Sequence, residues 1–484
     1  MWSQLRHVID FAVVEHGLFA EFGQSLGKVE LRGTFVNEHY ISARRADLLA
    51  PFVGEERTGH LQARLSAAAR QLAGRRVVNV TGDDRHKGGV FEILRNMLPY
   101  LRGAGIDVRW FDVTTPPEAR PALEFFHVLA HGRPPSRHWT DELPARTREL
   151  GEYSVSGAAE LAAMLAPMDI VVLHDTQTAP LADRLGPWEQ HLMWHGHIGT
   201  GVRNAVTDAY WEVLEPAVAA ARARVVYHAD YVPAKLRPVT AFIPPAVDPS
   251  IPKSAPLEPA RARQRLAADA PPCLSWHGPA PRVQDGTVLA LQVSRWDMLK
   301  DMPGVLRAFA QVADRVPGFC GLVVGPSAQS ERERTELALC LDEWEAWAPR
   351  IRARLHVGVI EACGSRDHDE AVRLLQSAAD IVVQKSIEEG FGLTVTEAMM
   401  RAKAVVASNV GGIPLQISDG EDGLLLLEPG DIDECATRIA DLVNQPDERE
   451  RLGAHARAKV LEHHAIDRQL ERISDVLRSL VLEP

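Results

Sequence analysis

The stretch DIVVQKSIEEGFGLTVTEAMMRAKAVVAS, residues 380–408, decides the fold. An apolar strand, Asp380–Gln384, precedes a turn that contains Gly390 and Gly392, and a helix begins near Leu393. A second apolar strand ends the stretch, and this strand–helix–strand order is typical of parallel sheets covered by helices. The two glycines allow a ligand to approach the backbone closely, and the free N–H groups of the helix favour an anion. The stretch therefore predicts an α/β fold with an anion-binding turn.

From about residue 75 onward, short β-branched runs alternate with helix-period segments in the same way. A first series of candidate strands comprises Arg76–Thr81, Ile106–Val113, Asp169–His174 and Arg224–His228. A second series comprises Val288–Ser294, Gly321–Gly325, Arg354–Val359, Asp380–Gln384 and Ala404–Ser408. The two series predict two facing Rossmann-like, doubly wound domains with a ligand site in the cleft between them.

Composition shifts along the chain predict its domain boundaries. Residues 251–286 contain prolines at seven positions, too many for continuous helix or a central strand, so we interpret them as the inter-domain connection with a short helix near Ala260–Ala267. The other expected parts are an N-terminal extension packed on the first domain (1–74), the first domain (75–250), the second domain (287–465) and a C-terminal helix (466–484).

Charge and hydropathy exclude several functional classes. The 484 residues include 53 Lys and Arg against 65 Asp and Glu, spread along the chain, which disfavours a nucleic-acid or anionic membrane surface. No run reaches the roughly 18 apolar residues of a spanning helix, and the N-terminus lacks the order of a signal peptide. Five scattered cysteines suit a reducing compartment. We expect a cytoplasmic protein, monomeric or homodimeric, that binds a sugar or a nucleotide.

Two carboxylates flank the glycine turn. Glu389 precedes it, and Glu397 lies eight residues later, about two turns into the helix. This separation can place one carboxylate at a reacting sugar and the other at a ribose. The alternative is that Glu397 complements the helix dipole while Glu389 faces water.

The pattern E-G-F-G-L-T-V-T-E-A-M (389–399), followed by V-G-G-I-P (410–414) and D-G-E-D-G (419–423), resembles the retaining GT-B glycosyltransferases of family four. Within that family the chain is most similar to trehalose synthases of the glycosyltransferring type. The same resemblance extends, in order, over Gly88–Val90, His174-Asp175, His197-Ile198, Pro244-Pro245 with Val247–Pro249, and Leu289–Asp297.

The resemblance implies a donor site on the second domain. Glu389 would contact the donor sugar, Glu397 the ribose, and Arg295 with Lys300 the diphosphate. Fixed cations can stabilise a departing diphosphate without a metal, although a surface ion pair of Arg295 with Asp297 is the alternative. The backbone around the donor would come from Gly390, Phe391, Gly392, Leu393, Thr394, Gly411, Gly412 and Ile413. The family usually has glycine where this chain has Asp301.

The first domain would supply the acceptor side. The loop Gly88, Gly89 and Val90 would approach the phosphates or the acceptor, and by resemblance His197 would contact the transferred sugar near its 6-hydroxyl. The polar residues His174, Asp175 and Gln177 end a strand and either contact acceptor hydroxyls or cap the strand. Relatives tend to have arginine at His195, aspartate at Gly199 and a more glycine-rich loop at residues 84–87, which weakens the case for glucose as acceptor.

One interpretation is that the three imidazoles of His191, His195 and His197 bind a zinc ion, because these residues share one face if they form a strand. No carboxylate or cysteine accompanies them at a suitable spacing, so we expect no metal site. The D-x-D strings at 367–369 and 431–433 fit helix N-terminal carboxylates, and we expect no catalytic magnesium or other cofactor.

The resemblance implies retaining transfer of a glucosyl group from a nucleoside-diphosphate glucose to a sugar, with glucose as the first candidate and α,α-trehalose as the product. One alternative keeps this chemistry with another sugar, a cyclitol or a small natural product as acceptor. A sugar-nucleotide 2-epimerase and a non-catalytic sugar-nucleotide-binding protein remain further alternatives.

Overall fold

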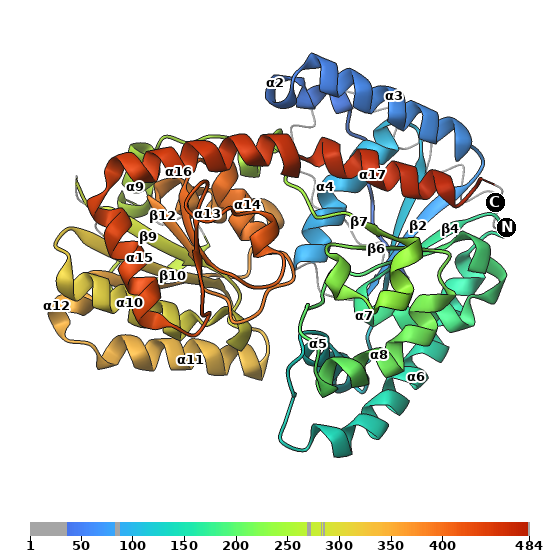
Figure 1. Ribbon diagram of the computed structural model, residues 1–484, viewed down its shortest axis with the longest axis horizontal. Coiled ribbons are helices and arrows are strands. Elements are labelled where there is room, and N and C mark those ends of the chain that lie inside the picture. Colours follow the sequence, from blue (N-terminus) through green and yellow to red (C-terminus); the bar gives the residue numbers. More distant parts are fainter. Residues whose placement is uncertain (1–35, 83–87, 269–272, 282, 284–285, 483–484) are drawn as a thin grey trace.

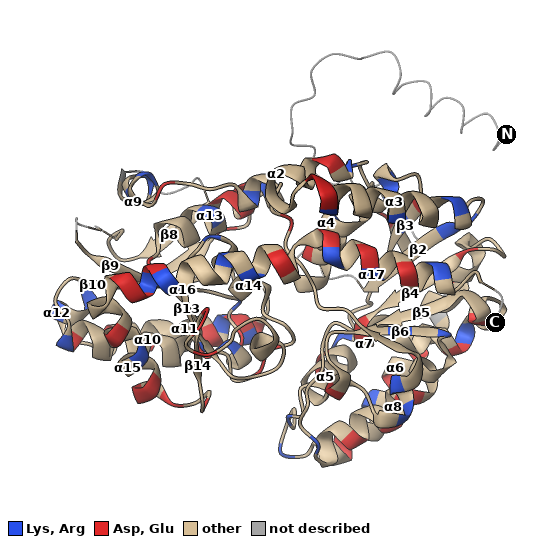
Figure 2. Cartoon of the chain, turned by 45° about the horizontal axis from the view of Figure 1, so that its top comes forward, with Lys and Arg blue, Asp and Glu red and all other residues tan. Residues whose placement is uncertain are grey.

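A computed structural model describes residues 36–82, 88–268, 273–281, 283 and 286–482. Two lobes lie side by side, each built on a seven-stranded sheet with helices on both faces (Figure 1). This arrangement confirms the two facing Rossmann-like domains expected from the sequence. Acidic and basic residues are interspersed along the helices of both lobes (Figure 2). Within the described ranges, no helix combines the length and the apolar character that crossing a bilayer requires.

The first sheet has the strand order β1-β3-β2-β4-β5-β6-β7, and only β1 runs antiparallel to its neighbour. Its strands are β1 (Val36–Glu38), β2 (Arg76–Gly82), β3 (Asp107–Val113), β4 (Ile170–His174), β5 (Leu192–His195), β6 (Ala223–Val226) and β7 (Thr240–Phe242). Its helices are α2 (Ala50–Val53), α3 (Glu55–Gln71), α4 (Gly89–Gly103), α5 (Arg120–Ala130), α6 (Trp139–Met164), α7 (Asp175–Thr178) and α8 (Ala205–Ala220).

The second sheet has the order β14-β13-β12-β9-β10-β11-β8, and only β8 is antiparallel. Its strands are β8 (Leu274–His277), β9 (Val288–Val293), β10 (Phe319–Pro326), β11 (Leu355–Ile360), β12 (Ile381–Gln384), β13 (Ala404–Ser408) and β14 (Leu424–Leu426). Its helices are α9 (Pro259–Ala268), α10 (Met302–Arg315), α11 (Glu331–Ala346), α12 (Pro349–Arg352), α13 (Ser365–Ala378), α14 (Leu393–Met400), α15 (Ile432–Asn444) and α16 (Pro446–Lys459).

Alternation along the central strands explains the layers. In β2, Val78 and Val80 face one buried cluster, which includes Phe126, while Val77 faces the opposite cluster with Leu94. Successive side chains of a strand point to opposite faces, so an unbroken apolar run requires cover on both sides. The near-continuous apolar strands therefore dictate a sheet between two helical layers.

The segment 251–286 differs from its interpretation as a connection. It supplies α9 to the core of the second domain and contributes β8, which pairs with β11 at the edge of the sheet. An edge strand tolerates neighbouring prolines because one of its sides carries no ladder.

The C-terminal helix α17 (Ile466–Ser479) returns from the second domain and lies along α3 of the first (Figure 1). Leu470, Ile473 and Leu477 share a buried cluster with Leu61 and Leu65 of α3. Of the expected N-terminal extension, residues 36–74 supply β1, α2 and α3 to the first domain, and residues 1–35 lie outside the described part of the chain.

Candidate active site

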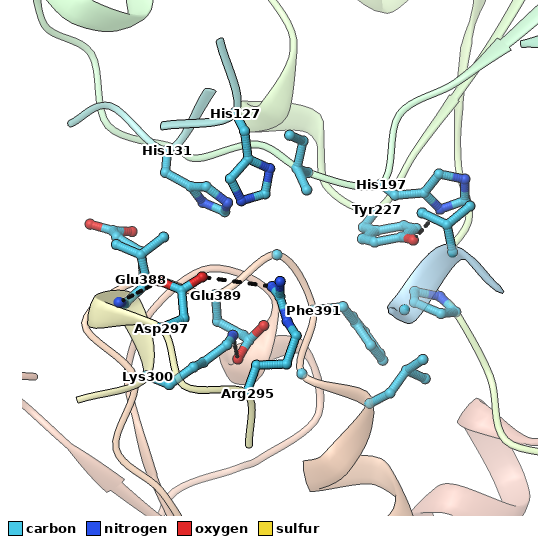
Figure 3. A pocket seen from close by; sticks show the side chains of 18 of the residues that line it. His127, His131, His197, Tyr227, Arg295, Asp297, Lys300, Glu388, Glu389 and Phe391 are labelled. Carbon is cyan, nitrogen blue, oxygen red and sulfur yellow. Dashed lines mark hydrogen bonds and ion pairs between the residues drawn. The ribbon is translucent and has the colours of Figure 1, made fainter. Parts of the chain in front are cut away.

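A cavity lies between the two domains (Figure 3). The first domain lines it with Gly89, Val90, Ile93, His127, His131, His197, Ile198, Tyr227 and Pro245. The second domain lines it with Arg295, Asp297, Leu299, Lys300, Glu388, Glu389, Gly390, Phe391, Gly392 and Leu393. Many of these residues follow the carboxyl ends of parallel strands, where ligands bind in open α/β sheets.

Glu389 and Lys300 form a close ion pair in the cavity. Lys300 Nζ donates to Glu389 Oε2 at 2.6 Å, and both side chains are largely buried. Ser386 Oγ donates to the same oxygen at 3.2 Å, and Ile387 N donates to Leu299 O at 2.8 Å. These contacts fix the loop before α14 against the loop after β9. The structure thus brings Glu389 and Lys300, which the sequence assigns to one donor site, together in one cavity.

Arg295 is held more loosely. Its guanidinium lies 3.8 Å from Asp297 Oδ2, its side chain is half exposed, and Arg332 approaches the other oxygen of Asp297 at 3.8 Å. Burial would raise the pKa of Asp297, but the nearby cations, Arg295 first, hold it below its usual value. The ion pair considered from the sequence exists, yet Arg295 still lines the cavity and can reach an anion there.

The glycine turn before α14 is tightly supported. Gly392 has a φ of +86° and caps the helix, a conformation that favours glycine. Tyr231 of the first domain donates its hydroxyl to Gly390 O at 2.5 Å, and Gly412 N donates to the same oxygen at 3.0 Å. A Cβ at Gly411, whose φ is +54°, would lie 1.6 Å from Glu389 O.

Several expected donor residues therefore support the turn and do not line the cavity. Gly411 and Gly412 pack against residues 389–391, and Ile413 is fully buried. Thr394 Oγ1 donates to Gln384 Oε1 at 2.7 Å. These residues shape the loop through the close approach of two backbone segments, and their contact with the edge of a donor stays a prediction.

Asp301, at the position usually occupied by glycine in the family, adopts a left-handed conformation with a φ of +45°. Its carboxylate accepts from Gly304 N at 3.1 Å, which caps α10, and pairs with the buried ammonium of Lys385. These two interactions offset the conformational cost of a non-glycine residue at this position.

Glu397 lies beside the cavity. Its carboxylate pairs with Lys253 Nζ at 2.7 Å, and both residues line a small adjoining pocket that shares Ile93 and Leu393 with the cavity. The sequence did not single out Lys253. Glu397 thus forms an ion pair with a distant lysine and does more than complement the helix dipole, and its contact with a ribose stays a prediction.

In the first domain, Gly88 caps α4 while Gly89 and Val90 line the cavity. The segment 84–87, where the family has a glycine-rich loop, lies outside the described residues. The amino end of α4 thus faces the second domain, as expected for this loop.

His197 lines the cavity, but both of its ring nitrogens are engaged. Nε2 lies 2.8 Å from Nδ1 of His174, and Nδ1 contacts the hydroxyl of Tyr227. Nε2 of His174 lies 3.0 Å from Oδ1 of Asn79, an oxygen that can only accept. His174 therefore donates to Asn79, His197 donates to His174, and Tyr227 donates to His197. The direct sugar contact expected of His197 would require this chain of hydrogen bonds to open.

The residues at the end of β4 do not line the cavity defined by the described residues. Asp175 Oδ1 accepts from the backbone N–H groups of His197 and Ile198, each at 3.3 Å, so the carboxylate has the capping role. The side-chain oxygen of Gln177 packs over Gly82. His195 is fully buried behind His197. In this conformation none of these side chains lines the cavity as the described residues define it, and their contact with an acceptor stays a prediction.

Sequence analysis missed two histidines on the wall opposite Arg295. His127 and His131 come from α5 and the residue that ends it, with ring centroids 5.1 Å apart (Figure 3). Burial, followed for His131 by the charge of Lys300, lowers the pKa of His127 to about 3 and that of His131 to about 4. Their spacing of four residues marks one helical face, a signal that was available in the sequence.

The comparisons with known proteins match each domain. Residues 78–233 match the family described as Trehalose synthase, N-terminal domain, and residues 279–459 match Glycosyl transferases group 1. A trehalose synthase from Rubrobacter xylanophilus is 32% identical over 83% of this chain and 90% of its own length. A trehalose synthase from Pyrococcus horikoshii is 29% identical over 92% of this chain and 99% of its own length.

Solved structures share the fold. A UDP-forming α,α-trehalose-phosphate synthase from Burkholderia xenovorans superimposes with a TM-score of 0.65 at 14% identity, covering 84% of this chain and all of its own. A sucrose-phosphate synthase from Thermosynechococcus elongatus gives 0.59 at 20% identity, covering 84% of this chain and 99% of its own. Both likenesses support the GT-B architecture.

Proposed function

This chain belongs to the trehalose synthase family of group 1 glycosyltransferases, and we propose that it transfers a glucosyl group, with retention, from a nucleoside-diphosphate glucose to a small sugar acceptor. Glucose is the first candidate acceptor, which would give trehalose. The sugar nucleotide is a substrate, and the transfer needs no metal at the diphosphate.

The observation that carries this proposal is the position of the Lys300–Glu389 pair, with Arg295 beside it, at the amino end of α14 in the inter-domain cavity. Departure of a nucleoside diphosphate leaves negative charge on the β-phosphate. Lys300, Arg295 and the free N–H groups of the helix can stabilise that charge in the cavity between the domains. The carboxylate of Glu389 can accept hydrogen bonds from hydroxyls of the transferred sugar.

Retention follows if the acceptor attacks from the face that the diphosphate leaves. The bond between the anomeric carbon and the β-phosphate oxygen breaks, the acceptor oxygen bonds to that carbon, and the acceptor proton passes to the departing phosphate. This scheme depends on positioning and charge stabilisation more than on a strong base. Glu389, paired with Lys300, then serves to orient the sugar.

A second candidate changes only the acceptor. A Cβ at Gly199 would lie 2.8 Å from Tyr231 Cβ, so the aspartate that relatives tend to carry there does not fit without a backbone shift. Because the acceptor side of this chain differs from that of its relatives at this position, the acceptor could be another sugar, a cyclitol or a small natural product. A 2-epimerase would change the configuration at C2 of the donor sugar and form no glycoside, which distinguishes it from both transferases.

The test is an NMR product assay with ADP-, UDP- and GDP-glucose and free glucose, run with and without EDTA. We expect an α,α-linked disaccharide, formed with one preferred donor and insensitive to EDTA. A disaccharide of inverted anomeric configuration would contradict the retaining mechanism. Acceptor-independent hydrolysis of one donor, without a disaccharide, would favour the second candidate. Absence of donor binding would contradict the proposal as a whole.

A further inference from the structure

Three histidines meet behind the wall of the cavity. His174 ends β4, His195 ends β5 beside it in the sheet register, and His197 follows two residues later. All three are at most 4% exposed. One ring nitrogen from each lies within 4.8 Å of the others, so all three could reach one ion. This trio differs from the one considered in the sequence, because His191 instead contacts Arg75 at 3.1 Å.

His195 lacks hydrogen-bond partners for both of its ring nitrogens among the described residues, although it is fully buried. A neutral imidazole carries one donor and one acceptor, and leaving either unsatisfied in the interior costs about 1–3 kcal/mol. No described residue satisfies the ring, so a bound ligand is one way to remove this cost. The ring of Tyr227 lies edge-on to that of His195, with the ring centroids 6.3 Å apart.

Hydrogen bonds from neighbouring residues already orient the rings of His174 and His197. Nε2 of His174 is hydrogen-bonded to Asn79, and Nδ1 of His197 is hydrogen-bonded to the hydroxyl of Tyr227. The other two nitrogens, Nδ1 of His174 and Nε2 of His197, face each other at 2.8 Å. Metal-binding histidines almost always have such a partner on the nitrogen that does not bind the metal. The arrangement supplies two ligands with their supporting hydrogen bonds in place.

Two of the three ring spacings agree with a shared ion. Two imidazoles bound to one tetrahedral ion at about 2.0–2.1 Å have their ring centres roughly 5 Å apart. The centroid distances of His174 to His197 and to His195 are 5.1 and 5.3 Å. His195 and His197 are closer, at 4.2 Å, so His195 must rotate slightly to bind.

We propose that His174, His195 and His197 bind one Zn²⁺ ion, with water in the fourth position. Three imidazoles without thiolates select a borderline divalent ion over Mg²⁺ or Ca²⁺. On binding, His197 ligates through Nε2 and its proton moves to Nδ1, which then donates to the oxygen of Tyr227. Since relatives tend to carry arginine at His195, the ion would place positive charge where they have a guanidinium. It orients His197 and Tyr227 from behind the cavity and lies apart from Lys300 and Arg295.

The test measures metal binding directly on tag-free, full-length protein. After treatment with EDTA and removal of the chelator, the protein is titrated with Zn²⁺ against a fluorescent indicator, and with Co²⁺ to follow visible d–d absorption. We expect one ion per chain and the intense absorption of a tetrahedral cobalt site. Octahedral, weakly absorbing cobalt, or no binding by the wild-type protein, overturns the proposal.

Two variants and a control locate the ion. His195→Leu removes a ligand and should weaken Zn²⁺ binding by more than about 100-fold, whereas Asn79→Ala removes only a supporting contact and should weaken it about 10–100-fold. His191→Leu, at the opposite end of β5, should leave affinity unchanged. Thermal unfolding and near-UV circular dichroism confirm that each variant is folded, and His195→Asn serves if His195→Leu is not. Equal affinity of wild-type protein and either His195 variant overturns the proposal.

Discussion

The ammonium of Lys253 lies 2.7 Å from a carboxylate oxygen of Glu397, and 3.5 and 3.9 Å from Glu92 and Asp369. These residues come from both domains and from the segment that joins them. Although burial lowers it, the carboxylates, Glu397 first, hold the pKa of Lys253 above its usual value. Arg95 extends the network by pairing with Asp369 across the domains at 2.9 Å. A single buried cation thus links the domain interface to a residue of the donor-site motif.

Replacing Lys253 by Met should destabilise the protein strongly, because three carboxylates would lose their common partner. Loss of one partner from a buried ion pair costs about 3–5 kcal/mol. Lys235→Met is the matched control, since its pair with Glu215 is exposed and should contribute less than about 1 kcal/mol. Urea unfolding of both variants measures the difference. Similar free energies of unfolding would show that the network contributes little to stability.

Lys300→Met should lower kcat by about 100-fold or more, because one fixed cation at the departing diphosphate is lost. The variant also leaves Glu389 unpaired, so its melting temperature should fall. Adding Glu389→Gln should restore the melting temperature without restoring kcat, which separates catalysis from stability. Arg350→Ala, which removes an exposed pair with Asp314, is the control. Near-normal turnover by Lys300→Met would remove Lys300 from the proposed mechanism.

Gly411→Ala should disrupt the glycine turn, since its Cβ would collide with the carbonyl oxygen of Glu389. Gly420→Ala provides a control with nearly the same backbone strain, because Gly420 has a φ of +76° but no atom within 4 Å of the added Cβ. Both variants pay the conformational cost of about 1 kcal/mol, and only Gly411→Ala should also lose activity. Equal effects in a coupled assay for nucleoside diphosphate release would show that strain alone matters.

Much of the donor domain could be predicted because its signals are local. The apolar run of β12, the glycines of the turn and the start of α14 follow one another within residues 381–400, and the structure places them as expected. The sequence does not predict β5, because a strand of only four residues, Leu192–His195, shows too little hydrophobic alternation to be recognised. β8 was missed because prolines surround it, although an edge position makes them tolerable.

The remaining features depend on residues far apart in the sequence. Lys253 and Glu397 are 144 positions apart, and no local pattern pairs them. The role of His197 also depends on two residues that are distant in the sequence. Asn79 accepts a hydrogen bond from His174, which contacts His197, and the hydroxyl of Tyr227 contacts Nδ1 of His197. The spacing of His127 and His131 was visible, but which surface they face is decided by the packing of one domain against the other.

The free energy of unfolding should fall as the pH drops from about 6.5 toward 4. Burial lowers the pKa of His464 and that of His131 to about 4, whereas an unfolded histidine has a pKa of about 6.5. Between these values the unfolded chain binds more protons, so each histidine destabilises the fold by up to about 1.4 kcal/mol per pH unit. His464→Gln should therefore give a shallower slope in urea unfolding between pH 7 and 4.5.

His131 should contribute a hydrogen bond to the diphosphate from the first domain. Its ring lines the cavity opposite Arg295 and Lys300, and its Nδ1 has no partner among the described residues. A hydrogen bond to a charged group contributes about 1.5–3 kcal/mol, so His131→Leu should weaken nucleoside diphosphate binding by about 10–100-fold. His131→Asn keeps an N–H donor near the position of Nδ1 and should retain most of the affinity. Calorimetric titration compares the two variants with wild-type protein. If both lose affinity equally, the ring acts only through its shape, and if neither does, it lies outside the diphosphate subsite.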